Sequence, residues 1–349
     1  MKNFTDKNLK KIINQKLKNI NLFFDNFLLT NLIFILYKTS RYSKYYYHTI
    51  FHKNKNGNAQ PIFKKDIPLL PEKNHNYLND EYVELSIIVP AYNVEKYIDQ
   101  CIASISSQNL TFTYEIIVVE DCSTDNTKNI CNQIKLKYDN IKIIYHEKNS
   151  GVSEARNTAL NNIKGRFITF VDSDDLICNN ILNQAMNLIR INKNIDVVGF
   201  KLYTFETDYD INNIKNNPDK IQSSIITGLD NIYKIAEGYP WGKIYHRRMF
   251  DNIRFPRGLC WEDGIILKIV MRRCTVYADL GVVGYLYRKT PNSITHSIKA
   301  KNLGYDHFYM INFCINEMKR LNLNIDTIFY KKIVEEATVF FKFKNFLFA

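Results

Sequence analysis

Residues 85–93 read LSIIVPAYN, a short apolar run that is interrupted by Pro90. A run of this kind is typical of a strand buried within a parallel sheet. Apolar side chains then recur at helical spacing from Val94 to Ile105, and Asn93 stands where a helix cap is expected. These residues predict a strand that is followed directly by a helix with one buried face.

The same alternation of strand and helix continues to about residue 200. Each expected strand is a short apolar run, and each expected helix carries apolar residues along one side. Strands are expected at 115–119, 141–145, 167–171 and 196–200, and helices from Thr124 or Asp125, from about Ser153 to a stop at Gly165, and over 179–190. This order implies right-handed crossovers and an α/β fold, in which a mostly parallel central sheet has helices on both faces.

The composition is that of a globular protein with a basic arm. Of the 349 residues, 46% are hydrophobic, which excludes a disordered polymer, a collagen-like fibre and a small disulfide scaffold. The seven cysteines are widely spaced and include no CxxC pair, so they indicate neither a zinc site nor a disulfide framework. The net charge is +12, and residues 1–65 hold most of it, with 13 Lys or Arg against 2 acidic residues.

Residues 20–37 are the most apolar part of this arm. Asp25 interrupts the run, and the uncharged segment 26–37 has 12 residues, whereas a helix that spans a membrane needs about 20. The flanking basic residues fit a helix that lies on an anionic membrane surface; a helix packed on the protein body or on another subunit is the alternative. No known reader motif accompanies the arm, so we expect no nucleic-acid partner. The expected location is the cytoplasm, and the inner face of the cell membrane if the arm binds lipid.

Polar residues gather where three of the expected strands end. Tyr92 and Asn93 follow the first strand, Glu120 and Asp121 follow the second, and residues 172–175 follow the fourth. Because ligands of such sheets bind at the carboxyl ends of the strands, these residues predict one shared site. The sequence has neither the glycine-rich dinucleotide fingerprint nor a P-loop, so a different kind of group would bind the phosphates of a nucleotide ligand.

A divalent cation is the group that we predict to bind these phosphates. Asp172, Ser173, Asp174 and Asp175 place three carboxylates in four residues, and these repel one another unless a cation or solvent screens them. Carboxylate oxygens suit Mg²⁺ or Mn²⁺, which share their coordination shell with substrate phosphates. An acidic helix N-terminus is the alternative interpretation of the same residues.

Four segments between residues 85 and 175 closely resemble the family 2 glycosyltransferases, which have the GT-A fold. They read SIIVPAYNVEKYI, EIIVVEDCSTDNT, NSGVSEARNTAL and GRFITFVDSDD, in the order and spacing of the family. A looser likeness continues through WGKIYHRRMFDNIRFPRGLCWED and YRKTPNSITHS. The resemblance implies a GT-A domain at 85–300 with its nucleotide-sugar side at 85–200 and its acceptor side at 201–300. It does not cover residues 1–84 and weakens after about 300, where the sequence pattern itself predicts a helical extension at 1–84 and C-terminal helices at 301–349.

The resemblance also implies roles for single residues. Tyr92 would stack on the nucleotide base, and Asp121 would contact the pyrimidine imide. Arg156 would lie near the nucleotide, unless it forms a surface ion pair. Asp172 would lie near the ribose and the metal, and Asp174 would bind the metal. The other implied site residues are Pro90, Asn93 and Ser173 on the donor side, Trp241 and Lys243 in the donor or acceptor pocket, and His296 near the diphosphate or metal.

Glu262 and Asp263 match the acidic pair of the family, in which the Asp is the general base. A sugar hydroxyl is a poor nucleophile, so a carboxylate must take its proton as it attacks. The resemblance therefore implies a metal-dependent inverting transfer of a hexose or N-acetylhexosamine from a UDP-linked donor to a saccharide or lipid-linked saccharide of a surface glycan. The alternatives are a nucleotidyltransferase that forms nucleotide sugars, which would need a glycine-rich loop after the first strand, and a non-catalytic glycan-binding module.

Overall fold

The computed structural model describes residues 82–206, 223–259, 261–290, 300–326 and 329. These residues belong to one compact unit, Leu70–Tyr330. The expectations for the basic arm, for His296 and for the C-terminal helices from residue 330 onward lie outside the described residues. None of the described helices is long and apolar enough to cross a membrane.

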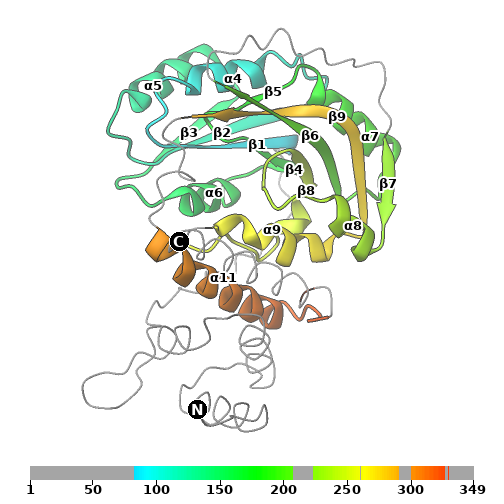
Figure 1. Ribbon diagram of the computed structural model, residues 1–349. Coiled ribbons are helices and arrows are strands. Elements are labelled where there is room, and N and C mark those ends of the chain that lie inside the picture. Colours follow the sequence, from blue (N-terminus) through cyan, green and yellow to red (C-terminus); the bar gives the residue numbers. More distant parts are fainter. Residues whose placement is uncertain (1–81, 207–222, 260, 291–299, 327–328, 330–349) are drawn as a thin grey trace, which may run out of the picture. The chain divides into compact units, whose positions relative to one another are not determined.

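Four parallel strands form the first half of the sheet, as the apolar runs predict (Figure 1). Their order across the sheet is β3 (Ile141–Tyr145), β2 (Tyr114–Glu120), β1 (Val83–Ala91) and β4 (Gly165–Phe170). Leu85, Ile87 and Ile88 of β1 are fully buried although neighbouring side chains point to opposite faces of the sheet. Both faces are therefore covered, which explains the unbroken apolar run. Pro90 pairs with Val119 near the carboxyl end of β1.

The second half of the sheet is mixed in direction. Its strands are β5 (Leu176–Ile177), β6 (Val197–Glu206), β7 (Ser224–Thr227), β8 (Lys243–His246) and β9 (Val276–Lys289). β8 pairs antiparallel with β4 and β6, β9 runs parallel to β6, and β5 and β7 pair antiparallel with β9. The strand expected at 196–200 is thus part of the longer β6, and β8 separates it from β4. The expected parallel arrangement is therefore found in the half of the sheet that contains β3, β2, β1 and β4.

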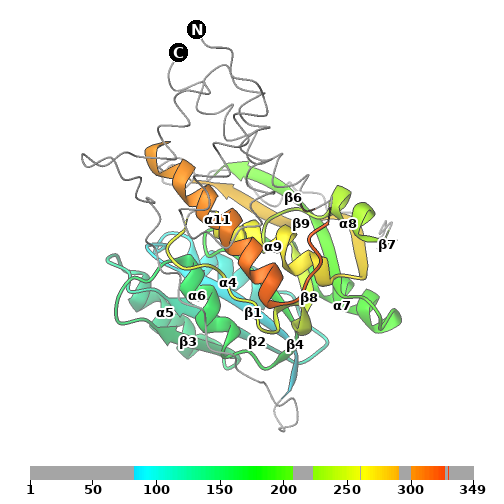
Figure 2. The same cartoon turned by 90° about the horizontal axis from the view of Figure 1, so that it is seen from below.

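Helices cover both faces of the parallel half. α4 (Ile98–Ser106) and α5 (Thr127–Lys137) pack against each other on one face, and α6 (Val152–Leu160) packs on β1 and β2 from the other (Figures 1 and 2). α4 buries Ile102 and Ile105 in the main core, as its periodicity predicts. The remaining helices of the described chain are α7 (Ile181–Ile191), α8 (Leu229–Ile235), η2 (Arg247–Phe250), η3 (Glu262–Gly264), α9 (Ile265–Lys268), η4 (Val270–Arg273) and α11 (Ala300–Arg320).

The expected helix caps are corrected by the structure. Asn93 has a left-handed backbone with φ 52°, and its side-chain oxygen accepts a hydrogen bond from Thr124 N at 2.8 Å. It therefore joins two loops instead of capping a helix, and α4 begins only at Ile98. α5 begins at Thr127, where the Asp125 carboxylate accepts a hydrogen bond from the Thr127 N–H although Asp125 is not the N-cap residue.

Gly165 does not end α6, which stops at Leu160. It is instead the first residue of β4, and its N–H donates to the Ser86 hydroxyl at 2.7 Å. A Cβ at this position would collide with the backbone of Ser86 on β1. The glycine is thus needed for the close approach of two strands.

Candidate functional site

Arg156 joins two acidic turns that are far apart in the sequence. It stands on α6, and its Nη2 donates to Asp172 Oδ1 at 3.0 Å while its Nη1 donates to Glu262 Oε1 at 2.7 Å. Asp172 follows β4 by two residues, and Glu262 is the first residue of η3. The two acidic turns therefore lie in one site.

The guanidinium of Arg156 is buried and forms salt bridges with both carboxylates. Arg156 is 4% exposed, and its guanidinium lies 5.3 Å from the ring centroid of Phe255. Burial alone lowers the pKa of an arginine, but the carboxylates of Asp172 and Glu262 raise the pKa of Arg156 above its usual value. The planar fork of arginine suits two carboxylates at once. The alternative of a surface ion pair is therefore wrong.

The acidic turn after β4 contains carboxylates of two kinds. Asp175 is buried, and its carboxylate accepts hydrogen bonds from the Tyr285 hydroxyl and from Arg288 N, each at 2.7 Å. The same Tyr285 oxygen accepts from Asp172 N at 3.1 Å, and Arg288 Nε donates to Asp174 O at 2.7 Å. Two residues of β9 thus hold the turn through Asp175 and the backbone and do not bond the side chains of Asp172 and Asp174. The Asp172 carboxylate is bonded through Oδ1 to Arg156.

These two carboxylates fit a divalent cation. Burial and the neighbouring Asp172 raise the pKa of Asp174 to about 6, so the pair favours the uptake of a proton or a cation. Mg²⁺ in phosphate-binding sites takes one or two protein carboxylates and completes its shell with phosphate and water. The described parts of the chain hold no cluster of three or more metal-ligating side chains, so the fit is to a cation shared with a substrate. His296 lies outside these parts.

Asp263 has the environment of a general base. Burial and the adjacent Glu262 raise its pKa to about 6, while Arg156 and Lys268 act in the opposite direction. The guanidinium of Arg156 donates to Glu262 and Asp172 and makes no hydrogen bond with Asp263. A carboxylate with this pKa is mostly ionised at neutral pH, yet it holds a proton more readily than an exposed aspartate.

Comparison with known proteins adds an independent observation. The family described as "Glycosyl transferase family 2" matches residues 86–254, which include Arg156 and the acidic turn after β4. The chain carries a glycosyl transferase family 2 domain.

Proteins similar to this family 2 domain include larger glycosyltransferases. Glycosyltransferase GlyA of Streptococcus pneumoniae serotype 4 is 31% identical over 217 residues, which cover 59% of this chain and 31% of GlyA. The poly(ribitol-phosphate) beta-N-acetylglucosaminyltransferase TarS of Staphylococcus aureus is 42% identical over 109 residues, or 31% of this chain and 19% of TarS. This chain thus spans less than a third of the length of either relative.

The fold of the family 2 domain is that of TarS. The crystal structure of S. aureus TarS 1–349 in complex with UDP-GlcNAc gives a TM-score of 0.58 at 27% identity, over 72% of this chain and 71% of that one. The expected GT-A fold is therefore confirmed.

In the family 2 domain, the predicted donor residues lie at the ends of β1, β2 and β4. Tyr92 is 43% exposed, so its ring is accessible to a base. Ser173 is buried within the acidic turn. Cys122 has a left-handed backbone with φ 58°, a conformation that glycine adopts more easily. The contact of Asp121 with a base stays a prediction, because its carboxylate is 2% exposed.

Trp241 and Lys243 are buried beside an aromatic stack. Trp241 lies between the rings of Tyr239 and Tyr285, with centroid distances of 4.2 and 4.4 Å. Lys243 Nζ donates to Tyr239 O at 2.9 Å, and burial lowers the pKa of Lys243 to about 7. Tyr239, at 37% exposed, is the most accessible ring of these three, and the expected roles of Trp241 and Lys243 in a pocket stay predictions.

Sequence reasoning missed Tyr239, Tyr285, Arg288 and His146. Tyr285 and Arg288 belong to β9, and only the pairing of β9 with β5 places them beside the acidic turn. His146 was accessible to sequence reasoning, because it directly follows the third expected strand. The rule that ligands bind at the carboxyl ends of parallel strands applies to it as it does to Asp121.

Proposed function

We propose that the family 2 domain transfers a sugar from a UDP-linked donor to a hydroxyl group of a cell-surface glycan. The observation that carries the proposal is the buried guanidinium of Arg156, which holds Asp172 and Glu262 in one site. The turn that would bind a cation therefore lies near the acidic pair that contains Asp263. Glycosyl transfer needs both, because the diphosphate must be stabilised as it leaves and the acceptor hydroxyl must lose its proton.

On the donor side, Asp172 and Asp174 would hold a Mn²⁺ or Mg²⁺ ion. Such an ion neutralises the negative charge that develops on the leaving diphosphate. The raised pKa of Asp174 supports this role, because burial and the neighbouring Asp172 disfavour its negative charge, which a cation would offset. The exposed ring of Tyr92 would stack on the nucleotide base.

On the acceptor side, Asp263 would take the proton of the attacking hydroxyl. The hydroxyl oxygen bonds to the anomeric carbon while the bond from that carbon to the diphosphate oxygen breaks, and its electron pair leaves with UDP. Attack from the face opposite the leaving group inverts the anomeric configuration. Glu262, held by Arg156, would orient the acidic pair.

The nature of the substrates is inferred from the relatives. The TarS structure contains UDP-GlcNAc, and the name of TarS gives poly(ribitol-phosphate) as its acceptor. We infer a UDP-linked hexose or N-acetylhexosamine as the donor, and a saccharide or lipid-linked saccharide of a surface polymer as the acceptor. We further propose that residues 1–65, with 13 Lys or Arg against 2 acidic residues, bind an anionic membrane surface where such an acceptor would be presented.

Release of UDP from UDP-sugars tests the proposal. The full chain is incubated with a panel of UDP-hexoses and UDP-N-acetylhexosamines, with and without Mn²⁺, in the absence of an acceptor. We expect at least one donor to release UDP in a cation-dependent way, and Asp263→Asn to lose this activity while it still binds UDP. A nucleotidyltransferase would instead form UDP-sugar from UTP and a sugar phosphate, and a glycan-binding module would release nothing. Either result, or wild-type turnover by Asp263→Asn, would contradict the proposal.

A further inference from the structure

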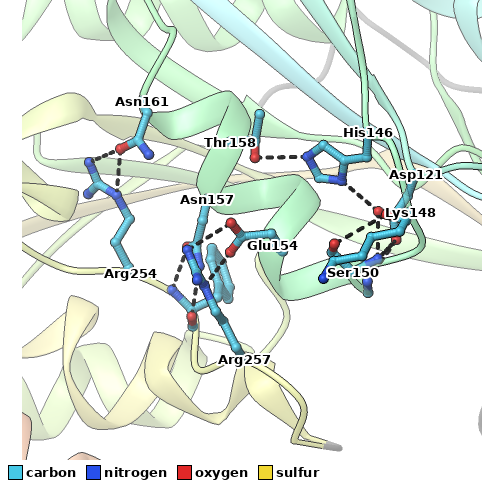
Figure 3. A network of polar contacts seen from close by, with 12 residues as sticks. Asp121, His146, Lys148, Ser150, Glu154, Asn157, Thr158, Asn161, Arg254 and Arg257 are labelled. Atoms are coloured by element: carbon cyan, nitrogen blue, oxygen red, sulfur yellow. Dashed lines mark hydrogen bonds and ion pairs between the residues drawn. The ribbon is translucent and has the colours of Figure 1, made fainter. Parts of the chain in front are cut away.

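His146 connects three elements at the nucleotide end of the site. It directly follows β3, and its backbone N–H donates to Glu120 O at the end of β2, at 2.9 Å. Its ring Nδ1 lies 2.6 Å from Asp121 Oδ1, and its Nε2 lies 2.9 Å from Thr158 Oγ1 on α6 (Figure 3). One imidazole thus joins the ends of β2 and β3 to the side of α6.

Asp121 in turn fixes the beginning of α6. Its carboxylate accepts a hydrogen bond from Ser150 N at 2.9 Å (Figure 3). It also accepts one from Gly151 N at 2.7 Å, and Gly151 is the residue that precedes the helix. A carboxylate at this place compensates N–H groups that the helix itself leaves unpaired. The same short helix carries Arg156.

These partners nearly saturate the Asp121 carboxylate. A carboxylate offers about four lone-pair positions, and three donors share them here. His146 and Ser150 N contact Oδ1, Gly151 N contacts Oδ2 at 2.7 Å, and the same Ser150 N–H also reaches Oδ2 at 3.1 Å. The terminal torsion of an aspartate is broad and roughly two-fold, so a partner on one side is needed to fix which oxygen is presented. The imidazole of His146 supplies that partner on Oδ1.

We propose that His146 is a positioning residue for nucleotide binding and that it acts through Asp121. The proposal rests on the proposed function and on the expectation, drawn from the family resemblance, that Asp121 meets the imide of the donor base. A proton on Nδ1 donates to Asp121, and the bare Nε2 accepts from the Thr158 hydroxyl, so one tautomer satisfies both neighbours. His146 then fixes the orientation in which the Asp121 carboxylate would meet the pyrimidine.

Two substitutions that differ by one methylene group separate this role from simple packing. The side-chain amide of His146→Asn ends near the position of Nδ1 and still reaches Asp121, whereas that of His146→Gln ends near the position of Nε2 and reaches Thr158 instead. We expect His146→Gln to raise the Kd for UDP with Mn²⁺, and the KM for the donor, roughly tenfold. We expect kcat to change less than about twofold, because Arg156 is held by Asp172 and Glu262 independently of His146. His146→Asn should remain within about threefold of the wild type.

Asn161→Ala is the matched control at the other end of α6. Asn161 Oδ1 accepts a hydrogen bond from Arg254 Nη2 at 2.8 Å, so this variant removes a polar contact of the same helix and leaves Asp121 untouched (Figure 3). Its Kd for UDP, measured by titration calorimetry, should equal that of the wild type. Wild-type affinity in His146→Gln overturns the proposal. Equal losses in both His146 variants also overturn it, because a packing defect affects both alike. A wild-type chain that binds no UDP instead refutes the proposed function itself.

Discussion

The raised pKa of Asp263 determines the pH dependence that we expect of the reaction. With a pKa of about 6, the carboxylate is ionised and able to accept a proton above that pH. At saturating Mn²⁺, kcat/KM for UDP release should therefore rise with pH until about 6 and then level off. Asp263→Asn should lower the rate roughly 100- to 10,000-fold and abolish this inflection. An unchanged inflection in the variant would assign the titration to another group.

Asp174 is expected to affect stability. Its pKa is raised from 3.8 to about 6, so the folded protein binds this proton more tightly than the unfolded chain does. The resulting stabilisation is present below pH 3.8 and is lost as the pH rises through about 6. Without a cation, Asp174→Asn should therefore raise the Tm at neutral pH by a few degrees, on the order of 1 kcal/mol.

Thermal unfolding in the presence of ligand tests whether Asp174 binds the cation. Mn²⁺ together with UDP should raise the Tm of the wild type and leave the Tm of Asp174→Asn unchanged. Asp139→Asn, at an exposed position beyond α5, is the control and should respond as the wild type does. An equal response of the Asp174 variant would rule out the cation site.

α6 is the helix that ties both acidic turns to the parallel strands, and its central contact is sensitive to geometry. A lysine at position 156 would bring a point charge in place of a planar fork, so it would not bond Asp172 and Glu262 together. We expect Arg156→Lys to lower the free energy of unfolding by about 2–4 kcal/mol, because a buried cation at this position would lose one of its two carboxylate partners. UDP release should fall by roughly 100-fold or more, because the two turns lose their alignment.

Arg257→Lys is the matched control for α6. Arg257 pairs with Glu154 on the same helix, but its side chain is 42% exposed (Figure 3). An exposed pair of this kind is worth about 0–1 kcal/mol. Urea unfolding should therefore distinguish the two lysine variants, and equal destabilisation would contradict the importance of the buried bridge.

The parallel strands of the sheet can be predicted from the sequence, and the mixed half cannot. β1 to β4 are apolar runs bounded by turn residues, so each one carries its own signal. β8 has only four residues, KIYH, and β9 pairs with β6 across a long separation in the chain. Which strand lies beside which, and in which direction, depends on these distant pairings rather than on local pattern.

The candidate site shows the same division. The family motifs predict that Asp172, Asp174 and Asp263 belong together. They do not predict that Asp175, in the same acidic turn, is a structural residue, because its partners Tyr285 and Arg288 come from β9. A motif specifies residue types at fixed spacing, whereas the sorting of neighbouring carboxylates requires knowledge of the strand that packs against them.

The positive charge of the chain is concentrated in its N-terminal part, which predicts binding to an anionic membrane. Most of the net charge of +12 lies in residues 1–65. We expect the full chain to co-sediment with vesicles that contain phosphatidylglycerol and not with phosphatidylcholine alone, and to dissociate at about 0.5 M salt. Replacement of Lys18, Lys38, Arg41 and Lys44 by Gln should weaken binding more than replacement of Lys128, Lys135, Lys137 and Lys142, which removes equal charge elsewhere. Equal binding by the two variants would contradict the proposed role of the arm.

The chain has two tryptophans, and both are placed at the acidic turns. Trp241 stacks on Tyr285, whose hydroxyl holds the backbone of Asp172, and the exposed Trp261 immediately precedes Glu262. Intrinsic fluorescence of the protein therefore originates almost entirely at the place where chemistry is proposed. Addition of UDP and Mn²⁺ should change the emission without any attached dye, and Trp261→Phe would leave Trp241 as the sole emitter. The molecule thus carries its own optical reporter of occupancy.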